Sequence, residues 1–288
     1  MFITAGGVVK RSIEVYRANF GSLMRYVGLL FGLGILAIVT LVAGIAAIIG
    51  FQAAPNLAMG PLGLLSLLSG TFFAFFIIWG IVFFILSLWI EIAFMRTVSR
   101  AVHGQSKISI GEEWKHSRPL IGKTLGVAIL NGLIVMLPFL VGIVGWMVVR
   151  TMSVFGGSAG LFRSLGLLCT LLSIYGFFHM IYFSIRLCFS SLGVVVDGRG
   201  VVESLKESSA LVKGRWWGVW WRMFVAVLAL IVPYYVFLLL GQIQGFVGIF
   251  FGLVTFVYYI FCLLPIAMIP SQVIYVSAKE SPVQKSSV

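Results

Sequence analysis

The chain has 288 residues, of which 61% are apolar and only 10% are charged, whereas a soluble domain carries about 25% charged residues. Its formal net charge is +12. This composition excludes an ordinary water-soluble domain and predicts a protein whose main solvent is lipid.

Four stretches without Asp, Glu, Lys or Arg are long enough to cross a membrane: 26–90, 124–149, 164–185 and 223–278. A helix crosses the hydrocarbon core in about 20 residues, so the first and last stretches hold two spans each. Turn-forming residues divide these two stretches: Gln52, Pro55, Asn56, Gly60 and Pro61 in the first, and Gly241, Gln242, Gln244 and Gly245 in the last. We therefore predict six spans, at about 24–51, 64–95, 120–148, 164–190, 217–240 and 246–276.

Basic residues lie almost entirely on one side of this predicted topology. Six spans place both ends of the chain on the same side, and of the 20 Lys and Arg only Arg150 and Arg163 face the other. The positive-inside rule then predicts a multi-pass protein of the cell membrane with a cytoplasmic N-terminus and C-terminus. The polar pattern of the first 20 residues and the length of the following apolar run predict that no signal peptide is cleaved.

The first predicted element, at 4–20, is an amphipathic helix on the membrane surface. It has an apolar face and a charged face: Val9, Ile13, Tyr16 and Phe20 on the first, and Lys10, Glu14 and Arg17 on the second. The apolar face would lie at the acyl boundary and the cations near phosphate head groups. The alternative is that this helix packs on the ends of the protein's own helices.

A second surface helix is predicted between spans two and three. Ser109 and Glu112 have the S-x-x-E spacing of a capping box, so the helix should begin at about Ile110. Trp114 should face the membrane interface, and Pro119 should end the helix because it has no backbone N–H to donate.

A third surface helix follows span four, after a turn at Asp197-Gly-Arg-Gly. Its predicted faces are apolar (Val201, Val202, Leu205 and Val212) and polar (Glu203, Lys206, Glu207 and Lys213). The next span begins with four tryptophans: Trp216, Trp217, Trp220 and Trp221. They lie at the depth where indole rings favour the membrane interface.

The three surface helices each precede a pair of spans, which predicts a weak threefold repeat with units at about 4–97, 109–194 and 200–277 and a tail at 278–288. Residues 1–288 would then form a single integral membrane domain. The predicted fold class is all-α: a polytopic transmembrane helical bundle with three cytoplasmic interfacial amphipathic helices.

The third surface helix also carries a resemblance. The run Ser204, Leu205, Ser208, Leu211, Val212, Lys213, Gly214, Arg215 and Trp216 follows the pattern A/S-L-x-x-S-x-x-L-V-K-G-R-W. This segment resembles the membrane domain of some bacterial glycerophosphodiester phosphodiesterases and related stand-alone six-helix proteins of unknown function. The resemblance covers about 30 residues and implies the fold alone, because such enzymes carry their activity in a separate soluble domain.

No catalytic constellation accompanies the spans, so we predict no enzyme, no cofactor and no metal. Four glutamates alternate with Lys on amphipathic helices in the manner of a solvated face: Glu112, Glu113, Glu203 and Glu207. His103 and His116 lie in a connector without metal-ligand spacing. Nucleic acid is not a predicted partner, because the cations are spread along a membrane rim where anionic lipid is the nearest polyanion.

Polar residues inside the spans are the remaining candidates for function. Glu91, Arg186 and Gln272 fall at equivalent places in the repeat, and we predict a cross-span ion pair between Glu91 and Arg186. His179 lies near the middle of span four, either as a proton-relay or ligand residue or as a neutral imidazole bonded to a neighbouring helix. Asn131 is predicted to form a hydrogen bond between helices.

The sequence thus predicts a non-enzymatic membrane protein that interacts with lipids or acts as a scaffold, with anionic lipids as partners. The cations predicted to contact head groups are Lys10, Arg11, Lys206, Lys213, Arg215 and Arg222. The alternative is a transporter of a small solute or lipid that uses Glu91, Arg186 and His179. A water-filled cavity reaching these three would favour transport, and a dry bundle would favour the scaffold.

Overall fold

The computed structural model describes residues 2–56, 71–105, 109–154 and 159–281, and these ranges are helical with no strand. The principal helices are α1 (Ala5–Asn56), α3 (Thr71–Val102), α4 (Ile110–Ser117), α5 (Ile121–Val154), α6 (Ala159–Arg186), α7 (Ser190–Val195), α8 (Val201–Val212), α9 (Trp216–Leu240), α10 (Phe246–Tyr258) and α12 (Ile269–Glu280). Short segments join them: η2 (Arg118–Leu120), η3 (Tyr259–Leu263) and α11 (Leu264–Ile266). The all-α fold class is therefore confirmed.

Six helical stretches are long and apolar enough to cross a membrane, as predicted: Ala5–Ala47, Phe73–Val102, Gly111–Met152, Phe162–Val195, Trp216–Leu240 and Phe246–Glu280. Three parts of the prediction lie outside the described residues: the turn residues Gly60 and Pro61, the start of span two at 64–70, and the tail beyond 281. The other three predicted turn residues, Gln52, Pro55 and Asn56, belong to α1. The turn between spans one and two therefore begins later than predicted.

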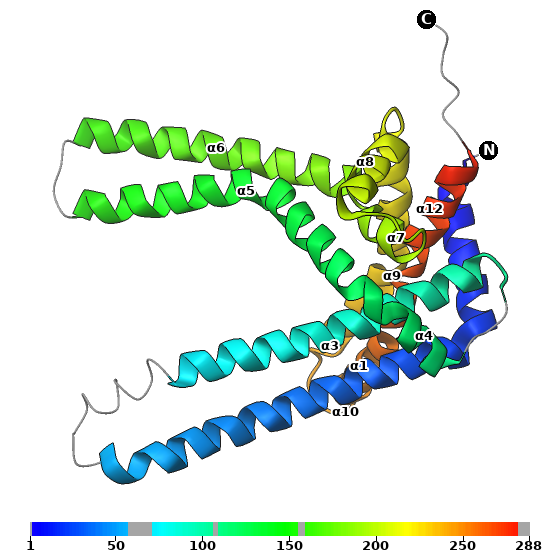
Figure 1. The fold of residues 1–288 in the computed structure, drawn as a ribbon, viewed down its shortest axis with the longest axis horizontal. Helices are drawn as coiled ribbons and strands as arrows, with labels where there is room; N and C mark the ends of the chain where they lie inside the picture. Colours follow the sequence, from blue (N-terminus) through cyan, green and yellow to red (C-terminus); the bar gives the residue numbers. More distant parts are fainter. Residues whose placement is uncertain (1, 57–70, 106–108, 155–158, 282–288) are drawn as a thin grey trace, which may run out of the picture.

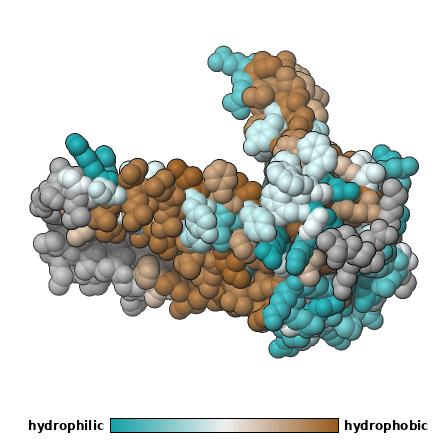
Figure 2. Space-filling model, turned by 90° about the horizontal axis from the view of Figure 1, so that it is seen from above, coloured by the Kyte–Doolittle hydropathy of each residue, from teal (hydrophilic) through white to brown (hydrophobic). Residues whose placement is uncertain are grey.

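The long helices pair into three antiparallel hairpins, α1 with α3, α5 with α6 and α9 with α10. Figure 1 shows the first two hairpins diverging from a common end, where α4, α7, α8, α12 and the start of α1 gather. We call this region the packed end and the hairpins the arms. Figure 2 shows hydrophobic surface along the arms and hydrophilic surface over the packed end. Arm residues such as Ile38 and Leu167, each 64% exposed, would face lipid.

A hydrophobic core occupies the packed end. Its buried residues come from most of the elements that meet there and include Val8, Tyr26, Phe94, Phe189, Val212, Val219, Ile274 and Tyr275. Two smaller apolar clusters, which include residues of α5, lie beside this core. Each arm is therefore anchored at one end only, and the packed end fixes how the three arms are arranged.

The first part of α1 packs on the protein, through a face that overlaps the predicted apolar face only in part. Helical geometry breaks at Asn19, where φ is −120° and ψ is 15°, so a separate N-terminal segment precedes the span. Its buried residues are Val8, Ser12 and Val15, and Val9 and Tyr16 of the predicted apolar face also pack against the core. The other two residues of that face, Ile13 and Phe20, are 38% and 44% exposed.

Helix α8 also differs from its predicted pattern. It buries Ser204, Leu205, Ser208 and Val212, but Val202 is 55% exposed, so its assignment to the apolar face was wrong. Ser204 and Ser208 occupy buried positions where α8 lies close to α7 and the end of α6, and Ser208 forms hydrogen bonds there. The face of α8 that contacts the protein is therefore narrow and partly polar.

Prolines lie at a bend or a break in two of the spans. Figure 1 shows α5 bending part-way along, and Pro138 lies inside this helix. The last span is interrupted by the π-helical segment η3, after which Pro265 and Pro270 begin new helical segments. Pro233 lies within a continuous α9.

Candidate functional site

A buried glutamate marks the most unusual polar site of the packed end. Ser109 caps α4 by accepting a hydrogen bond from the backbone N–H of Glu112, which confirms the predicted start of this helix. The cap orients α4 so that Glu113, only 2% exposed, faces inward, and a buried carboxylate requires compensating charge. The prediction that Glu113 lies on a solvated face was therefore wrong.

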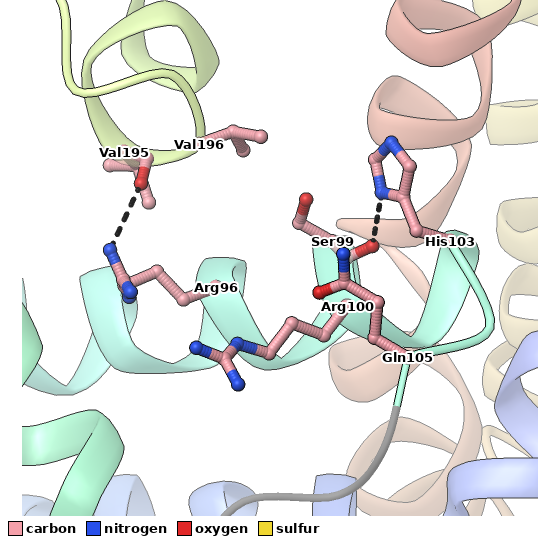
Figure 3. A pocket seen from close by; sticks show the side chains of 7 residues that line it. All are labelled: Arg96, Ser99, Arg100, His103, Gln105, Val195 and Val196. Atoms are coloured by element: carbon pink, nitrogen blue, oxygen red, sulfur yellow. Dashed lines mark hydrogen bonds between the residues drawn. The ribbon is translucent and has the colours of Figure 1, made fainter.

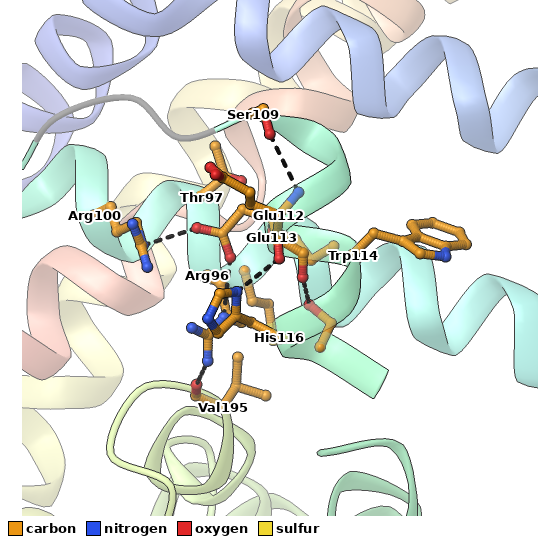
Figure 4. A network of polar contacts seen from close by, with 12 residues as sticks. Arg96, Thr97, Arg100, Ser109, Glu112, Glu113, Trp114, His116 and Val195 are labelled. Carbon is orange, nitrogen blue, oxygen red and sulfur yellow. Dashed lines mark hydrogen bonds and ion pairs between the residues drawn. The ribbon is translucent and has the colours of Figure 1, made fainter. Parts of the chain in front are cut away.

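Two arginines of α3 supply that charge. Arg96 and Arg100 are four residues apart and lie on the same side of the helix. The Nε atom of Arg96 lies 3.0 Å from Oε2 of Glu113, and the Nε atom of Arg100 lies 2.8 Å from Oε1 (Figure 4). Each carboxylate oxygen therefore has its own cation. We call Arg96, Arg100 and Glu113 the arginine–glutamate cluster.

Aromatic packing holds α4 against α3. The rings of Trp89 and Trp114 have centroids 4.0 Å apart, and Nε1 of Trp89 donates a hydrogen bond to the carbonyl oxygen of Trp114. Trp114 thus packs on the protein's own helix, contrary to its predicted place at the membrane interface. Pro119 lies in the 3₁₀ segment after α4 and ends that helix as predicted.

A pocket of about 260 Å³ opens beside the cluster. Its lining is almost entirely polar side chains and backbone: Arg96, Ser99, Arg100, His103, Gln105, Val195 and Val196. Figure 3 shows Arg96 and Arg100 side by side on one helix, with the Val195 carbonyl opposite Arg96. His103 and Gln105, at the end of the same helix, complete the lining. The pocket offers several hydrogen-bond donors and excess positive charge.

A second polar cluster surrounds the turn before α8. Asp197 accepts hydrogen bonds from the hydroxyl of Tyr275 and, at 2.6 Å, from Nζ of Lys279. The Nε atom of Arg199 lies 2.9 Å from a carboxylate oxygen of Glu207. Glu207 is 13% exposed and therefore belongs to this turn cluster instead of the predicted solvated face. The contacts tie the turn and α8 to α12.

The residues that carried the family resemblance join helices. The hydroxyl of Ser208 donates to the carbonyl oxygen of Arg186 and accepts the N–H of Phe189, which links α8 to the end of α6. Gly214 has a φ of +79°, a conformation that only glycine adopts readily. Arg215 then donates to the carbonyl oxygens of Ser281 and Ala278 at the end of α12. The motif thus has a structural role in the packed end.

The predicted ion pair between Glu91 and Arg186 does not form, and the hypothesis was wrong. Nε of Arg186 donates to the hydroxyl of Ser209 at 2.6 Å, and its guanidinium lies over the rings of Tyr182 and Phe183. The Glu91 side chain has no hydrogen bond or ion pair within the described part of the chain. The reason is topological: α6 meets α8 and α9 at this level, and α3 does not lie beside it.

The other polar residues of the spans lie apart from one another. The Nε2 atom of Gln272, which is 2% exposed, donates to the Met95 carbonyl oxygen at 3.0 Å and so joins α12 to α3. His179 stacks on Phe183, and its Nδ1 atom is buried without a hydrogen-bond partner in the described chain. The Oδ1 atom of Asn131 is equally unpartnered. The structure does not bring Glu91, Arg186, Gln272 and His179 into one site.

The six predicted head-group cations divide into two groups. Three of them are held by the protein: Arg11 by the Val102 carbonyl oxygen and Glu14, Arg215 by α12, and Arg222 by the carbonyl oxygens of Ile3 and Gly218. Three are exposed and form no hydrogen bond or ion pair within the described chain: Lys10, Lys206 and Lys213.

The four predicted interfacial tryptophans also divide. Trp217 and Trp221 are 73% and 52% exposed, whereas Trp216 and Trp220 are partly buried. Nε1 of Trp216 donates to the Tyr182 carbonyl oxygen, and Trp220 stacks on Phe224. Only Trp217 and Trp221 therefore present their rings to the surroundings of the protein. We call these two tryptophans with Lys206 and Lys213 the lysine–tryptophan rim.

Within the described residues, no group of three or more His, Cys, Asp or Glu could hold a metal ion. No protein-family model matches this chain, and neither a curated protein nor a solved structure matches it. The six apolar helices and the all-α arrangement indicate a multi-pass membrane protein.

Proposed function

We propose that this chain is a non-enzymatic component of the cytoplasmic membrane that interacts with lipids or acts as a scaffold, and that anionic head groups are its partners. The lysine–tryptophan rim is the observation that carries the proposal. Exposed indole rings at the start of an apolar helix favour the interfacial region of a bilayer. The exposed Lys213, four residues before Trp217, and the exposed Lys206 on α8 would then lie near phosphate groups.

The distribution of apolar surface supports the same proposal. The arms expose large hydrophobic side chains, for example Leu168 at 62% and Phe250 at 51%, as lipid contact requires. Basic residues gather at the packed end, and only Arg150 and Arg163 lie near the far ends of described helices. The positive-inside rule then places the packed end and both termini in the cytoplasm.

The resemblance to the membrane domain of bacterial glycerophosphodiester phosphodiesterases belongs to this proposal as a hypothesis about ancestry. It accounts for the Ser208–Gly214–Arg215 motif, which serves to join helices in this chain. It brings no activity, because the motif carries no catalytic group.

Native mass spectrometry of protein released from anionic nanodiscs tests the proposal. The variant Lys206→Gln/Lys213→Gln should retain fewer phosphatidylglycerol molecules than the parent, since each cation near an anionic surface contributes about 1 kcal/mol. Arg150→Gln/Arg163→Gln is the matched control, because it removes equal charge at the opposite end of the arms. Equal lipid retention by all three proteins would refute the rim as a lipid contact.

Transport of a small solute or lipid is the alternative, and the unpartnered Asn131 Oδ1 and His179 Nδ1 atoms favour it. Polar atoms left unsatisfied inside spans are costly and often belong to a pathway. The pocket beside Arg96 and Arg100 is not lined by Glu91, Arg186 or His179. The same is true of an apolar pocket that lies between α9 and α12. Solute flux into proteoliposomes that is abolished by His179→Ala would favour transport over the scaffold.

A further inference from the structure

We propose that the pocket beside the arginine–glutamate cluster is a binding site for a phosphate group, carried either by a lipid head group or by a soluble phosphate compound. The site lies on α3 and the α6–α8 connection and shares no residue with the lysine–tryptophan rim. The proposal is therefore independent of the proposed function.

The hydrogen-bond donors of the two arginines are only partly used. An arginine guanidinium carries five N–H donors. Nε of Arg96 donates a hydrogen bond to Glu113, Nε of Arg100 forms an ion pair with it that is not a hydrogen bond, and the Val195 carbonyl lies 3.5 Å from one terminal nitrogen of Arg96. The terminal nitrogens of Arg100 have no partner within the described chain. These nitrogens border the pocket, and guanidinium groups bind phosphate oxygens with matching, bidentate geometry.

The burial of the cluster fixes the donors in place before any ligand arrives. Glu113 is 2% exposed, and the side chains of Arg96 and Arg100 are 21% and 26% exposed. Glu113 orients the Arg96 guanidinium through a hydrogen bond and keeps that of Arg100 close through an ion pair, and the cluster retains one unit of positive charge in excess. Pre-oriented donors lose less freedom on binding than mobile surface side chains do.

The remaining lining residues suit the same ligand. The His103 ring has its Nδ1 atom 2.7 Å from the Ser99 carbonyl oxygen, and its Nε2 atom has no partner within the described chain. Gln105 adds a side-chain amide. At about 260 Å³ the pocket is smaller than the roughly 300–1,000 Å³ of pockets for drug-sized molecules. A single phosphate group is therefore a better match than a large metabolite.

The turn cluster provides an internal comparison. There three carboxylates, Asp197, Glu203 and Glu207, face two cations, Arg199 and Lys279. That cluster therefore carries excess negative charge, whereas the arginine–glutamate cluster carries excess positive charge and has the pocket. Among these two polar clusters of the packed end, only the arginine–glutamate cluster would attract an anion.

The test uses the full chain in nanodiscs of zwitterionic phosphatidylcholine and two probes. Inorganic phosphate is titrated by calorimetry, and phosphatidic acid incorporated into the nanodiscs is followed by native mass spectrometry. The main variant is His103→Ala/Gln105→Ala, because neither residue contacts Glu113 and the buried ion pairs stay intact. A second variant, Arg100→Lys, keeps the charge beside Glu113 but removes the forked donors. Lys206→Gln/Lys213→Gln is the control at the rim.

Saturable binding of inorganic phosphate that each pocket variant weakens about tenfold, and that the rim control leaves unchanged, supports a soluble ligand. Retention of phosphatidic acid that each pocket variant lowers, and that falls further when a pocket variant is combined with the rim variant than in the rim variant alone, supports a lipid head group. Binding of neither probe, phosphate binding lost equally in the rim control, or phosphatidic acid retention that only the rim variant lowers, overturns the proposal. Because the rim variant alone tests the proposed function, failure of one proposal is distinguishable from failure of the other.

Discussion

Because the carboxylate of Glu113 is buried, removing its two arginine partners should destabilise the packed end more than removing the carboxylate itself. Removing both cations, in Arg96→Gln/Arg100→Gln, leaves a charge that is 2% exposed without compensation. Loss of the partner of a buried ion costs about 3–5 kcal/mol of unfolding free energy. Removing the carboxylate instead, in Glu113→Gln, leaves two arginines that reach water through the pocket and should cost only about 1–2 kcal/mol.

The triple variant separates charge from packing. Adding Glu113→Gln to the double arginine variant removes the uncompensated charge and should restore about 2 kcal/mol of the stability lost. Unfolding free energies would be measured in mixed micelles by raising the mole fraction of sodium dodecyl sulfate and following helicity by circular dichroism. A matched control is Lys206→Gln/Lys213→Gln, since it also removes two positive charges but from exposed positions.

Two results would refute this reasoning. If the triple variant were no more stable than the double arginine variant, the buried charge would not be the source of the loss. If Glu113→Gln cost as much as the double arginine variant, the arginines would be as poorly solvated as the carboxylate. The second result would also contradict the open pocket beside Arg96 and Arg100.

Three further substitutions probe the joints between helices by the same unfolding assay. Gly214→Ala should cost about 1 kcal/mol because φ is +79° there, whereas Gly122→Ala, in open space on a helix, should cost nothing. Ser208→Ala should cost about 1–3 kcal/mol because it leaves a buried N–H unpaired, whereas exposed Ser164→Ala should change stability by less than about 0.5 kcal/mol. Gly176→Ala should cost about 1–3 kcal/mol, because its Cβ would lie 2.5 Å from the facing backbone of α5; an unchanged value would contradict that close packing.

Local signals in the sequence were reliable predictors of this fold. The number of spans follows from the lengths of charge-free runs, and the start of α4 follows from the Ser109 cap, which depends only on residues within one turn. Pro119 likewise ends a helix for a reason carried by its own ring. Each of these features is independent of how the helices pack on one another.

The arginine–glutamate cluster was missed because it depends on packing between helices. Glu112 and Glu113 are adjacent and look equivalent, yet only one of them can face inward. The signal available was periodicity: Glu113, Ser117 and Leu120 recur at i, i+4 and i+7, and all three are buried. This buried face was not recognised in the sequence because two of its three residues, Glu113 and Ser117, are polar.

The predicted pairing of Glu91 with Arg186 failed because a contact between helices was inferred from the repeat alone. Equivalent places in a repeat were taken as neighbours, but equivalent residues of divergent arms need not meet. Helix α6 meets α8 and α9 near its end instead of α3, and Arg186 turns to Ser209 on α8. Sequence symmetry therefore predicted the equivalence of positions without predicting their contacts.

Helix α12 shows how the packed end unites segments that are distant in the sequence. Its Ser277 hydroxyl accepts the N–H of Ile3, its Gln272 amide donates to α3, and Tyr275 donates to Asp197 in the turn before α8. The end of α12 accepts hydrogen bonds from Arg215 as well. Three separate polar contacts from one short helix thus reach the N-terminus, the first arm and the connection that follows the second arm. Because α10 pairs with α9 and runs back towards the end at which α9 begins, the last span delivers α12 into the packed end, where it contacts α1, α3 and α9.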